Sequence, residues 1–241
     1  MSAASGFQRR SEARTAVVWK ALRAELDTFP GPVRVLDIGG GTGGFAVRVA
    51  GLGHQVTVVD PNPDALAILD RRSEEGGVAD LVTGVQGDLA SLADLVPAAS
   101  VEVVLCHGVL EVVDTPLDGL RSLAEVLQPG GLLSLLVAQR HAAVIAKAMA
   151  GHFVQAGALL DQSPGVPHRL TADEVVDLLR QSGFGTPVLH AVRVFSDLVP
   201  SALLDLEPGA AAALAELEQA VAERPEYLAL ATQLHALARL G

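Results

Sequence analysis

A glycine-rich turn between an expected strand and an expected helix is the feature that most constrains the fold of this chain. Residues 33–38 form a short β-branched run that follows Pro32, and five of the six residues 39–44 are glycine. Residues 45–52 then have the spacing of a helix that ends at Gly53. A strand, a glycine turn and a helix in this order are typical of the first unit of a nucleotide-binding α/β fold.

The same alternation continues through the first 137 residues. Expected strands cover residues 55–59, 81–85, 101–106 and 132–137, and expected helices cover residues 64–72 and 117–127. Strands that alternate with helices predict a parallel sheet covered on both faces.

The remaining segments are less regular. Residues 12–28 and 141–160 have helical patterns, and residues 163–167 are expected to form a loop. Thr171 and Glu174 have the spacing of a capping box, which predicts a helix to about residue 181. Residues 188–195 are expected to form a strand and residues 209–223 a helix, whereas residues 227–240 fit either.

Composition limits the class of protein. A chain of 241 residues that is 50% hydrophobic can bury one sizeable core or two small ones. It contains no uncharged apolar run long enough for a membrane span and no apolar stretch typical of a secretory signal, so we expect a cytoplasmic protein. Cys106 is the single cysteine, which excludes an internal disulfide and a cysteine-rich metal site, and we expect it in the core.

The net charge of -11 argues against a surface that binds nucleic acid over its whole extent. A local basic site is compatible with the sequence, because residues 138–195 hold five basic groups and four acidic ones, while the rest holds 12 and 24. The acidic excess lies outside that stretch.

The glycine turn predicts a nucleotide-like ligand. Gly39, Gly41 and Gly44 fit the pattern G-x-G-x-x-G, and Asp60 ends the next expected strand, where a carboxylate can accept both ribose hydroxyls. This pattern suits NAD as well as S-adenosylmethionine. Asp37, before the first glycine, and residues 87–88, after the third strand, favour S-adenosylmethionine.

These motifs resemble those of the class I S-adenosylmethionine-dependent methyltransferases, on residues 37–43, 58–61 and 127–131. A narrower resemblance, to bacterial tRNA methyltransferases that esterify the carboxylate of 5-carboxymethoxyuridine, covers nearly the whole chain. It depends on residues 14–19, 106–111, 131–135, 150–157, 192–197 and 225–227.

The resemblance implies the roles of the cofactor-binding residues. It assigns Arg14 to the methionine carboxylate of the cofactor, the glycine turn to the methionine moiety, and His107 to the neighbourhood of the sulfonium. The predicted set, which also serves the product S-adenosylhomocysteine, is Arg14, Asp37, Gly39, Gly40, Gly41, Asp60, Pro61, Gln86, Gly87, Asp88 and His107. Arg14 is alternatively a solvated helix residue, and His107 is alternatively a strand-end histidine with a structural partner.

An anionic acceptor needs a cationic partner. The candidates are Arg193 in the sixth expected strand, Arg140 and His141 after the fifth, and the pair at residues 168–169. Each is alternatively a solvated surface charge. A carboxylate acceptor needs no general base, because it is already ionised near neutral pH, and we assign no acid or base.

Two departures weaken the tRNA assignment. The tRNA enzymes have a lysine-rich run where this chain has residues 159–167, and an aromatic and amide pair where it has residues 138–139. Aromatic residues, which stack unpaired bases, make up only 3% of the chain. The alternatives are therefore an O- or N-methyltransferase for a small metabolite and a cofactor-binding scaffold without turnover.

The predicted fold is a doubly wound α/β domain with a mostly parallel, seven-stranded, Rossmann-like sheet and a helical insertion after the fifth strand. The resemblance implies that the last strand is antiparallel. One methyltransferase domain is expected over residues 1–241, with an N-terminal helical cap (1–30), a cofactor-binding core (31–137), an acceptor-side insertion and helix (138–185) and C-terminal strands and helix (186–241). We predict no metal and no membrane contact, with tRNA or a small molecule as the acceptor.

Overall fold

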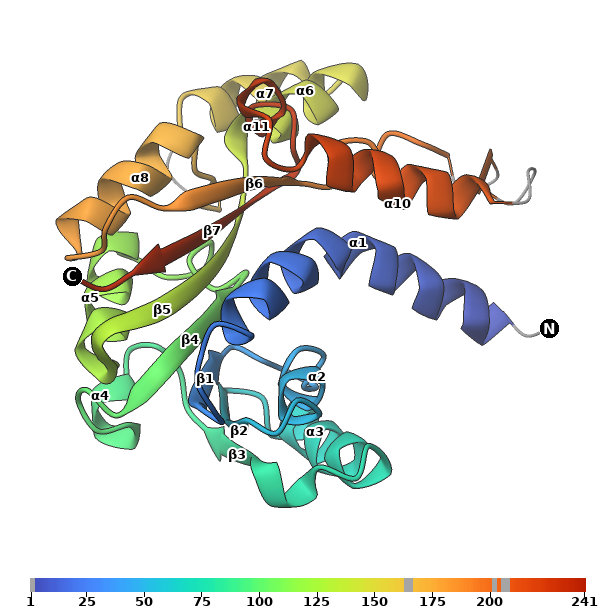
Figure 1. Ribbon diagram of the computed structural model, residues 1–241. Helices are drawn as coiled ribbons and strands as arrows, with labels where there is room; N and C mark the ends of the chain where they lie inside the picture. The colour runs from blue at the N-terminus through green and yellow to red at the C-terminus, as the bar shows by residue number, and fades with distance from the viewer. Residues whose placement is uncertain (1–2, 163–166, 201–202, 205–208) are drawn as a thin grey trace. The chain divides into compact units, whose positions relative to one another are not determined.

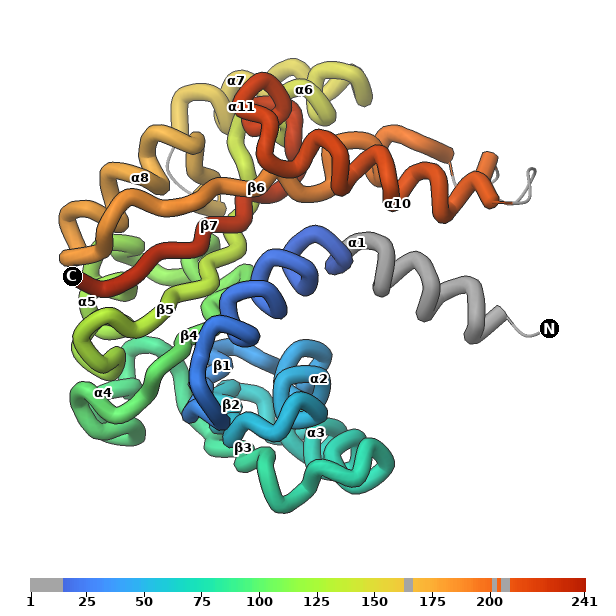
Figure 2. The backbone as a smooth tube through the Cα atoms, viewed as in Figure 1, coloured from blue at the N-terminus to red at the C-terminus, as the bar shows by residue number. Residues whose placement is uncertain are grey.

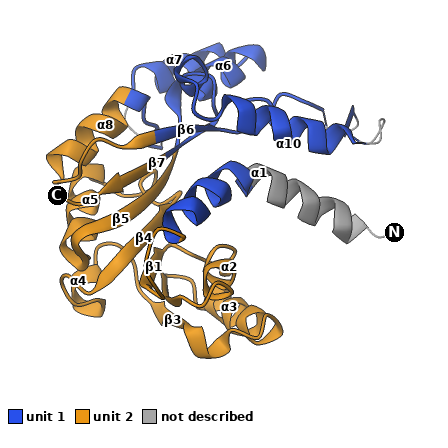
Figure 3. Cartoon of the chain, viewed as in Figure 1, with its two compact units in different colours: residues 1–26, 138–172, 189–235 blue, residues 27–137, 173–188, 236–241 orange. Residues whose placement is uncertain are grey.

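The computed structural model describes residues 3–162, 167–200, 203–204 and 209–241, and for residues 3–14 it gives the helix without the side chains. The chain forms two compact units that interleave along the sequence (Figure 3). Unit 1 comprises residues 1–26, 138–172 and 189–235. Unit 2 comprises residues 27–137, 173–188 and 236–241.

Five parallel strands form the centre of unit 2 (Figure 1). They are β1 (Arg34–Ile38), β2 (Gln55–Asp60), β3 (Val82–Gln86), β4 (Val101–His107) and β5 (Leu127–Ala138). Their order is β3-β2-β1-β4-β5, so the chain reverses direction across the sheet between β1 and β4. In a parallel sheet, ligands bind outside the carboxyl ends of the strands at such a switch point.

Short helices connect these strands. They are α2 (Ala46–Ala50), α3 (Pro63–Glu75), the 3-10 helix η1 (Ala79–Leu81), α4 (Leu92–Leu95) and α5 (Pro116–Val126). The start of α3 shows why the chain turns there, because the side chain of Asn62 accepts the N–H of Asp64 at 2.9 Å and Pro63 occupies the first turn.

The buried residues of β1 and β4 account for much of the core of unit 2. Leu36, Val104 and Leu105 are fully buried, as is Cys106, which confirms its expected place in the core. β1 aligns with β4 from Val35 opposite Val103 to Ile38 opposite Cys106. Both faces of these central strands are therefore covered, as expected for parallel strands with nearly continuous apolar runs.

Unit 1 contains most of the helices of the second half, with α1 from the start of the chain (Figures 1 and 2). They are α1 (Ala3–Leu26), α6 (Arg140–Met149), α7 (Phe153–Leu160), α10 (Ala210–Val221) and α11 (Pro225–Leu228). α1 packs against α10, and its residues Val17, Leu22 and Leu26 are buried. Another helix, α8 (Ala172–Gln181), begins in unit 1 and continues in unit 2.

Two further strands complete a seven-stranded sheet of order β3-β2-β1-β4-β5-β7-β6. They are β6 (Val188–Val192) and β7 (Gln233–Arg239). β7 is antiparallel to both of its neighbours. On the β6 side, backbone hydrogen bonds join Thr232 to Arg193 and Arg239 to Gly185. On the β5 side, backbone hydrogen bonds join Thr232 to Gln139 and Leu240 to Gly131. This arrangement confirms the predicted mostly parallel, doubly wound sheet.

Two expected elements differ from the structure. The helix expected over residues 141–160 is two helices, because the chain turns at Gly151 with a φ of 77°. The ambiguous segment 227–240 contains the end of α11 and then β7. The expected loop at residues 163–167 lies outside the described residues except for Pro167, and the single-domain boundaries remain a prediction.

Candidate functional site

The glycine loop of unit 2 follows β1 and folds back on the end of β2. The N–H of Gly39 donates to the carbonyl of Val59 at 2.7 Å, and the N–H of Gly43 donates to the carbonyl of Gly40 at 3.0 Å. Gly39 has a φ of 68°, which a residue with a side chain rarely adopts. A Cβ atom on Gly40 would lie 2.6 Å from the carboxyl group of Asp37, so only glycine fits there.

Asp60 fixes this loop from the end of β2. Its two carboxylate oxygens accept the N–H of Gly41 at 2.8 Å and the N–H of Asn62 at 2.9 Å. Only 8% of Asp60 is exposed, and that part faces a cavity. Each carboxylate oxygen has a second lone pair, so the residue can accept two more hydrogen bonds from a ligand.

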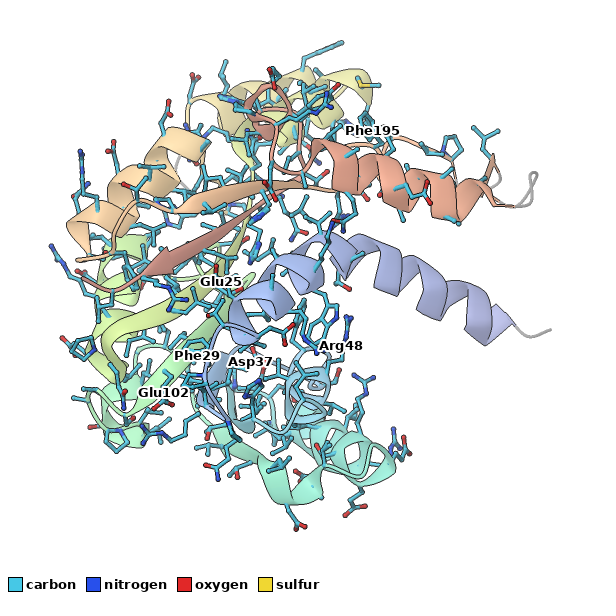
Figure 4. All side chains as sticks on the ribbon, viewed as in Figure 1. Glu25, Phe29, Asp37, Arg48, Glu102 and Phe195 are labelled. Carbon is cyan, nitrogen blue, oxygen red and sulfur yellow. The ribbon has the colours of Figure 1, made fainter. Side chains whose placement is uncertain are left out.

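Asp37 lies directly beneath the loop at the end of β1 (Figure 4). It is buried, and burial together with the negative charge of Asp60 raises its pKa to about 7. Asp37 therefore changes charge near neutral pH, in contrast to an ordinary aspartate.

A cavity of about 510 Å³ lies at the carboxyl ends of the strands of unit 2. This volume falls in the usual range for small-molecule and cofactor sites. Four of the predicted cofactor residues line it, namely Gly39, Asp60, Pro61 and Asp88. The other lining residues are Ile38, Leu89, Ala90, Gly108, Val109, Val112, Val113 and Asp114.

The remaining predicted residues of unit 2 surround this cavity without lining it. Asp37, Gly40 and Gly41 form and support the glycine loop, and the side chain of Gln86 donates to the carbonyl of Pro61 at 3.3 Å. The N–H of Gly87 donates to the carbonyl of Asp60 at 3.2 Å. These residues shape the walls of the cavity.

Asp88 closes a tight turn at the edge of the cavity. Its carboxylate accepts the N–H and the hydroxyl of Ser91, at 2.9 and 2.8 Å. These hydrogen bonds, with the Ser91 hydroxyl as the largest cause, lower the pKa of Asp88. Asp88 therefore stays ionised and fixed in position.

His107 has structural partners at the end of β4. Its Nε2 lies 2.9 Å from the hydroxyl of Ser134, and its ring packs edge-on against Phe45 with centroids 4.7 Å apart. Burial lowers its pKa to about 4, so the imidazole is neutral at physiological pH. The predicted contact between His107 and the cofactor remains a prediction.

The segment after β4 contributes cavity residues that sequence reasoning did not assign. Val109, Val112 and Val113 come from residues 108–114, which follow the fourth strand as the glycine loop follows the first. Val112 is 79% exposed, which is unusual for a large apolar residue. The sequence signal that could have found them is the group of valines at positions 109, 112 and 113, shortly after Gly108.

The candidate acceptor residues lie in unit 1. Arg193 has a φ of 61°, and its guanidinium donates to Asp197 at 2.7 Å and to the side chain of Gln233 at 3.4 Å. The buried carboxylate of Glu218 holds the turn that follows Arg193, because it accepts the backbone N–H groups of residues 194–196 at 2.8 to 3.0 Å. Arg193 is thus a fixed, partly buried cation with an acidic partner. The neighbouring Phe195, which is labelled in Figure 4, packs on the ring of Tyr227.

Arg140 and His141 begin α6. The Nε of Arg140 donates to the carbonyl of Arg169 at 3.2 Å, and the ring of His141 lies 3.3 Å from the amide of Gln139. Gln139 in turn accepts the N–H of Ala142 at 2.8 Å and caps the helix. Arg14 belongs to α1, and its side chain lies outside the described residues.

A second cavity of about 510 Å³ lies within unit 1. Residues of α6 and α7 form most of its wall, and Arg169, Asp197 and Thr232 complete it. Asp197 is the acidic partner of Arg193, so the candidate acceptor cation lies next to this cavity.

Within the described side chains, no group of three or more His, Cys, Asp or Glu residues is arranged to hold a metal ion. None of the described helices is both long and apolar enough to cross a membrane.

Comparisons with known proteins define the family. Residues 36–135 match the model of a methyltransferase domain. An S-adenosylmethionine-dependent methyltransferase of Mesorhizobium loti superposes with a TM-score of 0.61 at 21% identity, over 94% of this chain and 99% of the other. A Burkholderia thailandensis 1,6-didemethyltoxoflavin-N1-methyltransferase with bound S-adenosylhomocysteine superposes with a TM-score of 0.57 at 22% identity, over 95% of this chain and 78% of the other.

The chain therefore belongs to the class I S-adenosylmethionine-dependent methyltransferases and is an enzyme of that class. Its similarity extends further to one type of member. The tRNA 5-carboxymethoxyuridine methyltransferase of Escherichia coli O157:H7 is 31% identical over 237 residues, which cover 95% of this chain and 89% of the relative.

Proposed function

We propose that this enzyme transfers a methyl group from S-adenosylmethionine to the carboxylate of 5-carboxymethoxyuridine in tRNA and forms the methyl ester. The observation that carries the proposal is the similarity to a tRNA 5-carboxymethoxyuridine methyltransferase over 95% of the chain.

The cavity of unit 2 fits the cofactor. Gly40 leaves no room for a side chain above Asp37, and Gly39 exposes its backbone to the cavity. The carboxylate of Asp60 is held by two backbone N–H groups and keeps lone pairs for the two ribose hydroxyls. Asp88, Leu89 and Ala90 would hold the adenine, and Val109, Val112 and Val113 would exclude water from the other side.

The bound cofactor supplies a methyl group on a positively charged sulfur. An oxygen of the acceptor carboxylate forms the new C–O bond as the methyl–sulfur bond breaks, and the electron pair of that bond stays on sulfur. No proton has to leave the acceptor, because a carboxylate is ionised near neutral pH. The residues of this chain contribute by aligning the two reactants.

Arg193 would hold the acceptor carboxylate. A guanidinium can bind a carboxylate through two parallel hydrogen bonds, and here Asp197 and Gln233 fix its orientation. Asp197 already occupies part of the donor set, so an acceptor would either share the guanidinium or displace Asp197. Arg140 and His141, at the start of α6, would place a second basic group near the acceptor.

Transfer of labelled methyl groups to tRNA tests this function. The enzyme is incubated with methyl-labelled S-adenosylmethionine and tRNA that carries 5-carboxymethoxyuridine, and matched tRNA that lacks the modification is the control. We expect label only in the first sample, and mild alkali should release it as methanol because esters hydrolyse and N- or ether-linked methyl groups do not. Alkali-stable label would contradict ester formation.

The dependence on salt gives a second test. Binding of tRNA through phosphate contacts weakens steeply as the salt concentration rises. A neutral small acceptor would show almost no such dependence, so a flat salt profile for turnover would favour the small-metabolite alternative.

A further inference from the structure

The cavity of unit 1 contains two cations without a compensating acid. Lys147 of α6 and Arg169 both line it. Among the described residues, neither side chain has a hydrogen-bond or ion-pair partner. Asp197, the one acid among the described residues of the cavity wall, is paired with Arg193 through a contact of 2.5 Å. The local charge is therefore positive in a protein whose net charge is -11.

Most of the other described residues of the wall are small or apolar, and Gln155 and Thr232 are the polar ones among them. Ala142, Ala143 and Ala146 of α6 and Ala158 and Leu159 of α7 line the cavity, and the short side chains of the alanines leave space between the two helices. A wall rich in alanine methyl groups can contact the apolar part of a flat or compact organic ligand, and the two cations can bind an anionic group attached to that ligand.

The position of the cations distinguishes them from ordinary surface charges. Both side chains are partly buried at the wall of a cavity, whereas Arg180 and Arg121 extend from their helices into solvent and pair with acids three residues away. Two cations at the wall of one partly apolar cavity are complementary to an anionic ligand.

We propose that this cavity binds an organic molecule that carries a phosphate or carboxylate group, with Lys147 and Arg169 as the groups that hold the anion. The inference deepens the proposed function, on which it rests, because it states that the acceptor has a second anionic group besides the carboxylate that is methylated. In an RNA acceptor this anion is a backbone phosphate, and in a small acceptor it is another acidic group.

Direct binding to the intact protein tests the site without any methyl transfer. Calorimetry compares two pairs of probes, uridine 5′-monophosphate with uridine, and benzoate with benzyl alcohol. We expect the acidic member of at least one pair to bind at least tenfold more tightly than its neutral partner. A preference confined to the nucleotide pair indicates an RNA phosphate, and a preference confined to benzoate indicates a small acid.

Three variants locate the effect. The double change Lys147→Gln and Arg169→Gln should weaken binding of the preferred acid at least tenfold, and Ala146→Leu should do the same by filling the space. Arg180→Gln is the matched control and should leave binding unchanged, because Arg180 pairs with Asp177 on α8. Melting temperatures close to that of the parent protein would show that the variants are folded.

The proposal is overturned if neither acid binds more tightly than its neutral partner, or if the double variant or the Ala146→Leu variant binds as the parent protein does. Loss of the tRNA reaction in the assay above, with acid binding intact, would instead count against the proposed function alone.

Discussion

Asp37 and Asp60 form a pair of neighbouring carboxylates below the glycine loop, and burial of Asp37 together with the charge of Asp60 raises the pKa of Asp37 to about 7. Asp60 is the member that the backbone stabilises, because two N–H groups donate to it. The two residues are therefore set for different tasks, Asp60 as the carboxylate that holds the glycine loop and Asp37 as a group whose charge depends on pH near neutrality.

The first prediction concerns stability without cofactor. A carboxyl group whose pKa is higher in the folded chain than in the unfolded chain stabilises the fold when it is protonated. This stabilisation is complete below the pKa of about 4 that an aspartate has in the unfolded chain, and it is lost as the pH rises through the folded pKa of about 7. The Asp37→Asn variant has no titrating group at this position, so it does not lose this stability as the pH rises. We expect the free energy of unfolding of the variant, relative to the parent protein, to rise by roughly 2 kcal/mol between pH 5 and pH 8. Urea denaturation at both pH values measures it, and a constant difference would contradict the raised pKa.

The second prediction concerns the affinity for the cofactor relative to the affinity for its product. S-adenosylmethionine carries a positive sulfonium that S-adenosylhomocysteine lacks, and an ionised Asp37 would favour the cation. The ratio of the two affinities should therefore shift several-fold toward S-adenosylmethionine between pH 6 and pH 8. Asp37→Asn should show a flat ratio. Equal pH profiles for the parent protein and the variant would place Asp37 outside the field of the sulfonium.

The third prediction tests the ribose contact. Asp60→Ala removes two charge-assisted hydrogen bonds of about 1.5 to 3 kcal/mol each, and it also releases the N–H groups of Gly41 and Asn62. We expect at least tenfold weaker binding of S-adenosylhomocysteine by calorimetry. Asp70→Ala, at an exposed position of α3, is the control and should bind normally. Normal affinity in Asp60→Ala would refute this placement of the ribose.

The fourth prediction tests the acceptor cation. Arg193→Ala should raise the KM for modified tRNA at least tenfold and leave the affinity for S-adenosylhomocysteine unchanged. Arg193→Lys keeps the charge but cannot form two parallel hydrogen bonds to a carboxylate, so its KM should lie between those of the parent protein and Arg193→Ala. If the cofactor affinity falls while the dependence on tRNA is unchanged, Arg193 does not hold the acceptor.

The sequence predicts the parallel half of the sheet well, because its strands are short runs rich in β-branched residues or leucine and are bounded by glycine, proline or a helix cap. It fails for β7. Residues 235–239 are His-Ala-Leu-Ala-Arg, whose alanines and leucine favour a helix by local propensity. They form a strand because pairing with β5 and β6 buries Ala236 and Ala238, and such long-range pairing leaves no local signal.

The site divides in the same way. Gly39, Asp60 and Asp88 are predictable because each follows a recognisable strand, and all three line the cavity. The acidic partner of Arg193 is four residues away, in a turn that the distant Glu218 holds. Charge counts along the sequence could locate a basic stretch but could not show that Asp197 neutralises part of it.

Mass spectrometry of the nucleoside product shows whether the enzyme forms the methyl ester of 5-carboxymethoxyuridine. The enzyme and S-adenosylmethionine are incubated with tRNA that contains 5-carboxymethoxyuridine, and the tRNA is digested to nucleosides. Our account predicts that this nucleoside, and no other, gains one methyl group as its methyl ester. An unchanged nucleoside, from protein shown by calorimetry to bind the cofactor, would contradict the account.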